Sequence, residues 1–150
     1  MNRRKFLTLS VATALTLPIA SFATDYRVEK PAAWKAKTVD EAVKGLYGDV
    51  TLIESKDVIV KAPKVATGAV PVTIQTSIKA KSVSLFQDVN PESAVGTWTV
   101  PEGGIVDYRL KIKLRQSEKP AVLSVVVEGI DGKFYTAHTL VTVAGATCEG

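Results

Sequence analysis

The fold is decided by the stretch from Val106 to Arg115, which reads VDYRLKIKLR. Apolar residues alternate along it with charged ones, the apolar set being Val106, Tyr108, Leu110, Ile112 and Leu114. Successive side chains of a β-strand point to opposite faces, so this pattern predicts a strand with one face in a core and the other in solvent. The solvent face carries a basic row of Arg109, Lys111, Lys113 and Arg115.

Further stretches of strand character lie on both sides of this one, bounded by Pro, Gly, Asn or Asp. They are Val50–Val60, divided by the polar Ser55-Lys56-Asp57, then Val70–Ile78, Val83–Gln87, Val95–Val100, Val122–Glu128 and Phe134–Val143. The decisive stretch itself extends over Ile105–Arg115. About seven strands at this spacing predict a mainly β chain folded as an immunoglobulin-like antiparallel β-sandwich.

One of these strands is apolar on both faces. Its sequence from Val122 to Val127 is VLSVVV, without a charge. Such a strand is either central and covered on both sides, or its outer face is an interface. The pair Asp131-Gly132, just beyond it, predicts a tight hairpin into the last strand.

A single short helix is expected before the strands. Thr38 and Glu41 have the spacing of a capping box, apolar residues follow at helical spacing to about Tyr47, and Gly48 is a natural stop. The residues before it, 25–37, are polar and include Pro31 and Trp34, which predicts an extended leader with an exposed Trp34.

Residues 1–23 have the pattern of a twin-arginine export signal. Arg3 and Arg4 precede Lys-Phe-Leu, an uncharged apolar run extends from Leu7 to Leu17, and Ser21-Phe22-Ala23 forms a small-residue cleavage site. The run is too short to span a bilayer. We therefore expect export to the periplasm, with a mature chain that starts at Thr24.

Removal of this signal changes the charge of the protein. The full chain has 19 basic and 15 acidic residues, and the signal holds three of the basic residues and none of the acidic ones. A mature net charge of +1 gives no support for binding to nucleic acid or to a membrane surface, because both require a dominant positive field. The basic row is then either a solvated strand face or a docking patch for an anionic partner.

The only cysteine, Cys148, lies in the segment 144–150, whose sequence is AGATCEG. A thiol there does not help to close a core, and terminal segments are poorly ordered unless they are tied down. We expect three parts: the signal 1–23, a β-sandwich domain 24–143 and a mobile cysteine-bearing arm 144–150. A lone nucleophile on such an arm suggests covalent carriage, whereas the alternative is a non-carrying binding or assembly module whose tail forms an intermolecular disulfide.

Other chemistry has little support in the sequence. One histidine, His138, and one cysteine do not make the usual nitrogen and sulfur ligand sets of a metal site, and no cofactor motif is visible. His138 is expected on a strand surface, and Glu128 and Asp131 are better explained by the hairpin that they flank. No base or oxyanion donor can be named beside Cys148, so an enzyme is disfavoured.

These features together resemble the SoxY family of the bacterial thiosulfate-oxidising Sox system. The resemblance rests on the export signal, the capped helix, the terminal cysteine, and the stretches Gly68–Ile74 (GAVPVTI) and Asp131–Tyr135 (DGKFY). It covers essentially all of the mature chain. The arm departs from the Gly-Gly-Cys-Gly-Gly of the family, because Ala146-Thr147 precedes the cysteine and Glu149 follows it.

The resemblance implies an immunoglobulin-like carrier that is not itself an enzyme. Sulfur intermediates of thiosulfate or sulfide oxidation would be attached covalently to Cys148, with no catalytic residue and no cofactor or metal. The implied partners are a SoxZ-like β-sandwich subunit, in a heterodimer, and the Sox-type periplasmic sulfur-oxidising enzymes. The same two-faced apolar strand and the helix, which needs a surface to pack on, suggest an interface with that subunit.

Overall fold

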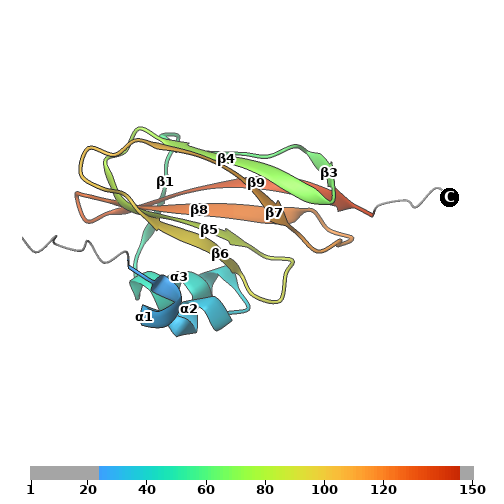
Figure 1. Cartoon of the computed structure of the whole chain (residues 1–150), viewed down its shortest axis with the longest axis horizontal. Helices are drawn as coiled ribbons and strands as arrows, with labels where there is room; N and C mark the ends of the chain where they lie inside the picture. The colour runs from blue at the N-terminus through green and yellow to red at the C-terminus, as the bar shows by residue number, and fades with distance from the viewer. Residues whose placement is uncertain (1–23, 146–150) are drawn as a thin grey trace, which may run out of the picture.

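The computed structural model describes residues 24–145, which form a sandwich of two β-sheets with three helices on one side (Figure 1). The larger sheet has the order β1-β9-β8-β5-β6, with β3 also paired to β9. Its strands are β1 (Leu52–Glu54), β3 (Val65–Thr67), β5 (Ala80–Gln87), β6 (Ala94–Thr99), β8 (Ala121–Gly129) and β9 (Phe134–Ala144). The smaller sheet has the order β2-β4-β7, with bounds Val58–Lys61, Ala69–Thr76 and Val106–Lys113.

The predicted fold class, a mainly β immunoglobulin-like sandwich, is confirmed. Residues 24–145 form nine strands rather than about seven, because Val50–Val60 divides into β1 and β2 at the polar tripeptide and the three-residue β3 was not predicted. The pairings of β1 and β3 with β9 are parallel, whereas all the others are antiparallel. Strands of three residues leave too short a pattern to be recognised in the sequence.

The main core lies between the two sheets. The decisive strand β7 buries Val106 and Ile112, with Leu114 just beyond it, and exposes its basic residues, as its alternation predicts. Facing residues come from β4, β5 and β8, and those with no exposed surface are Val70, Ile74, Val83, Leu85, Leu123, Val125 and Val127. These buried side chains hold the two sheets against each other.

The strand with two apolar faces, β8, is central, and helices cover its outer face. Val126 of β8 and Phe86 of β5 are fully buried against Ala42, Val43 and Leu46 of α3 (Val39–Tyr47). The predicted helix therefore packs on β8, the strand whose outer face could have been an interface with a partner. Neither the strand with two apolar faces nor the helix requires a partner subunit to cover it. The interface that the sequence suggested from these two features is therefore not supported by them.

The caps of α3 agree with the sequence, with one difference. Thr38 Oγ1 accepts a hydrogen bond from the Glu41 amide at 3.3 Å, and Gly48 ends the helix with φ of +80°. The Glu41 carboxylate accepts from the amide of Lys37 at 3.2 Å. The Glu41 carboxylate therefore binds the amide of Lys37, whereas a capping box predicts a bond with the amide of Thr38.

The prediction of an extended leader is wrong. Residues 26–35 form two short helices, α1 (Tyr26–Glu29) and α2 (Pro31–Lys35). Ala33 of α2 is fully buried against α3 at Gly45, where an added Cβ would lie 2.7 Å from the Ala33 backbone. Trp34, expected to be exposed, is half-buried, and the Arg27 guanidinium lies 4.5 Å from its ring centre. Close packing on α3, rather than local propensity, explains these helices.

The β8–β9 hairpin follows its turn residues. Asp131 Oδ1 accepts from the Lys133 amide at 3.1 Å, Gly132 has φ of +79°, and the Tyr135 hydroxyl donates to Asp131 Oδ2 at 2.7 Å. The Tyr135 hydrogen bond, followed by that of Lys133, lowers the pKa of the Asp131 carboxyl. The turn brings β9 back along β8 in a fixed register, toward the other end of the sandwich.

Candidate functional site

Cys148 lies outside the described residues. The structure does describe β9, the strand after which the predicted arm begins. This strand, β9, is eleven residues long and pairs with β8 along one side. On its other side Ala144 pairs with Thr67 of β3, and the Thr142 amide donates to the Lys64 carbonyl at 2.8 Å. The start of the arm is therefore held from two sides.

Gly145, the last described residue, lies against the side chain of Gln116. A Cβ at Gly145 would be 2.8 Å from Gln116 Oε1, so a side chain there would require the end of the Gln116 side chain to move. Three residue steps of 3.8 Å place the Cys148 Cα within about 11 Å of the Gly145 Cα. Whatever reacts with Cys148 must approach this end of the sandwich.

A buried amide network organises the same end. Gln87 is fully buried, and its Oε1 accepts from the amides of Val89 and Asn90 at 2.8 and 2.6 Å. The Asn90 side chain in turn donates to the Lys113 carbonyl at 2.9 Å and accepts from the Arg115 amide at 2.7 Å. The end of the basic row is thereby fixed next to Gln116 and the root of the arm.

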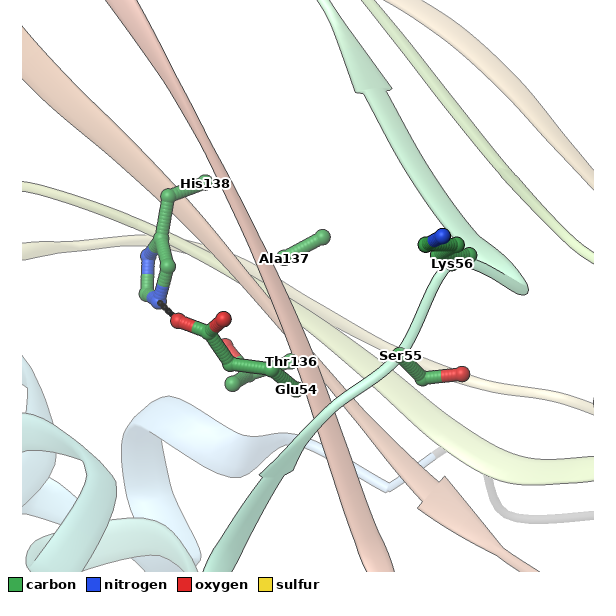
Figure 2. Close-up of a pocket in the computed structure, with 6 residues that line it drawn as sticks. All are labelled: Glu54, Ser55, Lys56, Thr136, Ala137 and His138. Atoms are coloured by element: carbon green, nitrogen blue, oxygen red, sulfur yellow. Dashed lines mark ion pairs between the residues drawn. The ribbon is translucent and has the colours of Figure 1, made fainter.

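An open hollow of about 430 Å³ lies between β1 and β9, lined by Glu54, Ser55, Lys56, Thr136, Ala137 and His138 (Figure 2). Within it His138 Nε2 faces Glu54 Oε1 at 3.9 Å, the pair joined by the dashed line in Figure 2. The other ring nitrogen, Nδ1, is hydrogen-bonded to Ser124 Oγ at 2.8 Å. His138 of β9 thus contacts Ser124 of β8 on one side and Glu54 of β1 on the other.

This serine, histidine and glutamate do not form a hydrolytic triad. Ser124 is 3% exposed, so its hydroxyl cannot reach a substrate as a nucleophile. The His138 side chain is 42% exposed, in agreement with its predicted place on a strand surface. The partners of His138 were not predicted from the sequence. Ser124 follows from the register of the β8–β9 hairpin, but Glu54 becomes a neighbour only through the parallel pairing of β1 with β9.

Residues 24–145 contain no cluster of three or more potential metal ligands, and none of their helices is long and apolar enough to cross a membrane. Glu128, predicted to have a structural role, accepts from Ser82 Oγ at 2.9 Å and lies 3.8 Å from Lys81 Nζ.

Comparisons with known proteins agree with this architecture. The family described as "Sulfur oxidation protein SoxY" matches residues 43–148. The solved structure of the sulfur carrier protein SoxY from Chlorobium limicola f thiosulfatophilum is 31% identical, with a TM-score of 0.63 over 71% of this chain and 96% of that one. A superoxide reductase (neelaredoxin) from Ignicoccus hospitalis is 17% identical over 58% of this chain and 80% of its own, with a TM-score of 0.46. No curated protein sequence matches.

The match with the structure of a SoxY sulfur carrier protein places this β-sandwich in the class of sulfur carriers. The match over most of the chain goes further: this protein belongs to the SoxY family of sulfur oxidation proteins. The match with the family also ends at Cys148.

Proposed function

We propose that this protein is a periplasmic carrier that holds sulfur intermediates covalently on Cys148 and presents them to partner enzymes. The observation that carries the proposal is the position of Cys148: it is the only thiol, it stands at the limit of the SoxY match, and it follows β9 by four residues. The twin-arginine pattern of residues 1–23 supports export. The protein itself would be acted on rather than catalytic.

Loading of thiosulfate on this thiol is an oxidation. The Cys148 thiolate and thiosulfate form a new S–S bond and give a cysteine S-thiosulfonate, and two electrons leave to an oxidant in the partner enzyme. The thiol loses its proton to solvent or to a base of that enzyme. A carrier needs no catalytic group of its own for this step, because the enzyme takes in the arm and supplies the electron acceptor.

Intact-mass measurement tests the carrier function. The mature protein is incubated with thiosulfate and the purified Sox enzymes of the same organism, and we expect a mass increase on Cys148 that a reductant removes. Cys148→Ser should abolish the increase and the oxidation of sulfur, whereas Thr147→Ser, next to it, should retain both. A Cys148→Ser protein that supports normal sulfur oxidation would favour the alternative, an assembly module with a disulfide-forming tail.

We also propose a heterodimer with a SoxZ-like subunit. The resemblance to SoxY supports it, and so do two exposed isoleucines, Ile105 and Ile130, at 87% and 58% exposure. Ile130 lines a hollow of about 380 Å³ with Pro101 and Gly104, beside the β8–β9 hairpin. Because β9 is eleven residues long, this hairpin is about 35 Å from the root of the arm, and a partner there would leave Cys148 accessible.

Co-expression tests the heterodimer. We expect the mature chain to form a stable 1:1 complex with the SoxZ-like subunit and to self-associate without it. Ile105→Asp with Ile130→Asp should weaken the complex, and Val28→Asp, an equally exposed position on α1, should not. A soluble monomer under reducing conditions, with the same stability alone as with the partner, would count against the heterodimer.

A further inference from the structure

The outer face of the smaller sheet carries a concentration of positive charge. Its basic residues, here called the basic face, are Lys61 of β2 and Arg109, Lys111 and Lys113 of β7, all of them exposed. The mature chain as a whole is nearly balanced in charge. This face therefore has a local positive charge that the balance of the whole chain does not reveal.

Few acidic groups neutralise the basic face. Asp107 Oδ1 lies 3.6 Å from Arg109 Nε. Among the residues that the structure describes, no acidic group lies within ion-pair distance of Lys61, Lys111 or Lys113. Three of the four cations are therefore available to an external anionic group.

The shape of the basic face suits a protein surface better than a small anion. Lys61 and Arg109 both pair with Thr73 of the central strand β4, so they lie two strand spacings apart, about 10 Å. Arg109 and Lys113 are four residues apart on one strand, about 13 Å. The β4 positions between them hold the uncharged Ala69, Pro71 and Thr73. Side chains that stand side by side on a sheet do not converge on one small ligand, but they can face a complementary surface.

The basic face continues to the root of the arm. Lys113 pairs with Ala69 of β4, which follows β3 closely, and β3 pairs with Ala144 of β9. Asn90 fixes the backbone at Lys113 and Arg115, and the next residue, Gln116, lies against Gly145. An enzyme whose active site receives Cys148, within about 11 Å of Gly145, therefore has its surface beside this face.

We propose that the basic face docks an acidic surface of the enzyme that acts on Cys148. The inference rests on the proposed carrier function and adds the surface that brings enzyme and arm together. Complementary charge of this kind accelerates encounter and sets orientation, and salt weakens it. Both β2 and β7 are edge strands, where lysine also discourages aggregation, so edge protection is the explanation that the experiment must separate.

The experiment compares two triple charge reversals in the carrier purified with any subunit that co-purifies. The first is Arg109→Glu, Lys111→Glu and Lys113→Glu; the control, Lys30→Glu, Lys35→Glu and Lys37→Glu, makes the same change of charge on exposed residues of the helical side. Association with the purified Sox enzymes is measured with Cys148→Ser present in every protein, so that docking is read without chemistry. We expect the first triple to associate at least about tenfold more slowly at low salt, the control to change less than about threefold, and the difference to vanish near 1 M salt.

A chemical reaction without enzyme separates a docking surface from attraction of small anions. The Cys148 thiolate displaces thiosulfate from tetrathionate, breaking the central S–S bond and giving the cysteine S-thiosulfonate. We expect this rate, measured by intact mass, to be equal in the wild type and both triples. A first triple that slowed tetrathionate as much as it slowed enzyme association would overturn docking in favour of small-anion attraction.

Two further results have distinct meanings. Unchanged association of the first triple, together with its aggregation by light scattering, would overturn the proposal in favour of edge protection. Enzymes that bind the wild-type carrier in a salt-dependent way but never add mass to Cys148 would refute the carrier function and leave the docking surface standing.

Discussion

The two outer faces of the sandwich differ although both sheets bury their inner faces in the same core. On the larger sheet the outward residues Phe86 and Val126 are fully buried, because the helices lie over them. On the smaller sheet the outward residues of β7 are charged and exposed. Figure 1 shows the helices gathered beneath β5 and β6, with β4 on the far side of the sandwich.

This difference shows what each strand pattern means. Alternation, as in β7, marks a face left open, whereas an uncharged and mostly apolar run, as in β8, marks a strand that is covered on both faces. In this chain the cover is supplied from within, by residues 26–47. The covered outer face therefore adds buried apolar contacts to those of the core between the sheets, whereas the charged outer face of β7 adds none.

The largest effect should follow removal of a side chain beneath the helices. Phe86→Ala leaves a cavity at a fully buried position between β5 and α3, and we expect it to lower the free energy of unfolding by about 3–5 kcal/mol. Lys111→Ala on the open face should change it by less than about 0.5 kcal/mol. Urea denaturation measures both. Comparable losses in the two variants would show that the two faces do not differ in stability.

A smaller effect tests the contact between the helices themselves. Gly45→Val would place a Cβ 2.7 Å from the Ala33 backbone, and because neither helix backbone can yield easily, we expect a loss of about 1–3 kcal/mol. Lys44→Val, the neighbouring exposed position, should lose only its ion pair with Asp49 and some helix propensity. Equal denaturation midpoints for the two variants would mean that α2 is not held at Gly45.

Much of the fold could be predicted because its signals are local. The alternation of β7, the Thr38 cap of α3 and the Asp131-Gly132 turn each depend on residues close in the sequence. The helices α1 and α2 could not be predicted, because Ala33 of α2 becomes buried only when α2 packs against Gly45 of α3. Short elements of this kind depend on packing, which a single sequence pattern does not contain.

The candidate site divides in the same way. Cys148 stands out in the sequence as a lone thiol, and the basic row is visible in the alternation of β7. The sequence did not place Lys61 beside this row, because β4 lies between their strands, and it did not show that Asn90 fixes the end of the row. The attachment of sulfur to Cys148 remains a prediction, because that residue lies outside the described part of the chain.

The smallest effect concerns the polar contacts that hold α3 on the larger sheet. The Tyr47 hydroxyl is hydrogen-bonded to Ser84 Oγ at 2.6 Å and to Ser82 Oγ at 3.1 Å. Tyr47→Phe removes these bonds, but Ser84 keeps Thr97 and Ser82 keeps Glu128 as partners, so we expect a loss of only about 0.5–1.5 kcal/mol at neutral pH.

The pH dependence of the same variant is more diagnostic than its stability. Burial, opposed by the hydrogen bonds of Ser82 and Ser84, raises the pKa of Tyr47 above its ordinary value of 10.0. The folded protein then retains a proton that the unfolded chain releases, so this contribution to stability is complete below about pH 10 and falls as the pH rises through the folded pKa. Urea denaturation between pH 8 and about 11 should therefore show a shallower alkaline decline for Tyr47→Phe than for the wild type. Parallel declines would mean that Tyr47 ionises as readily in the folded protein as in the unfolded chain, and hence that α3 does not seal this edge of the covered face from water.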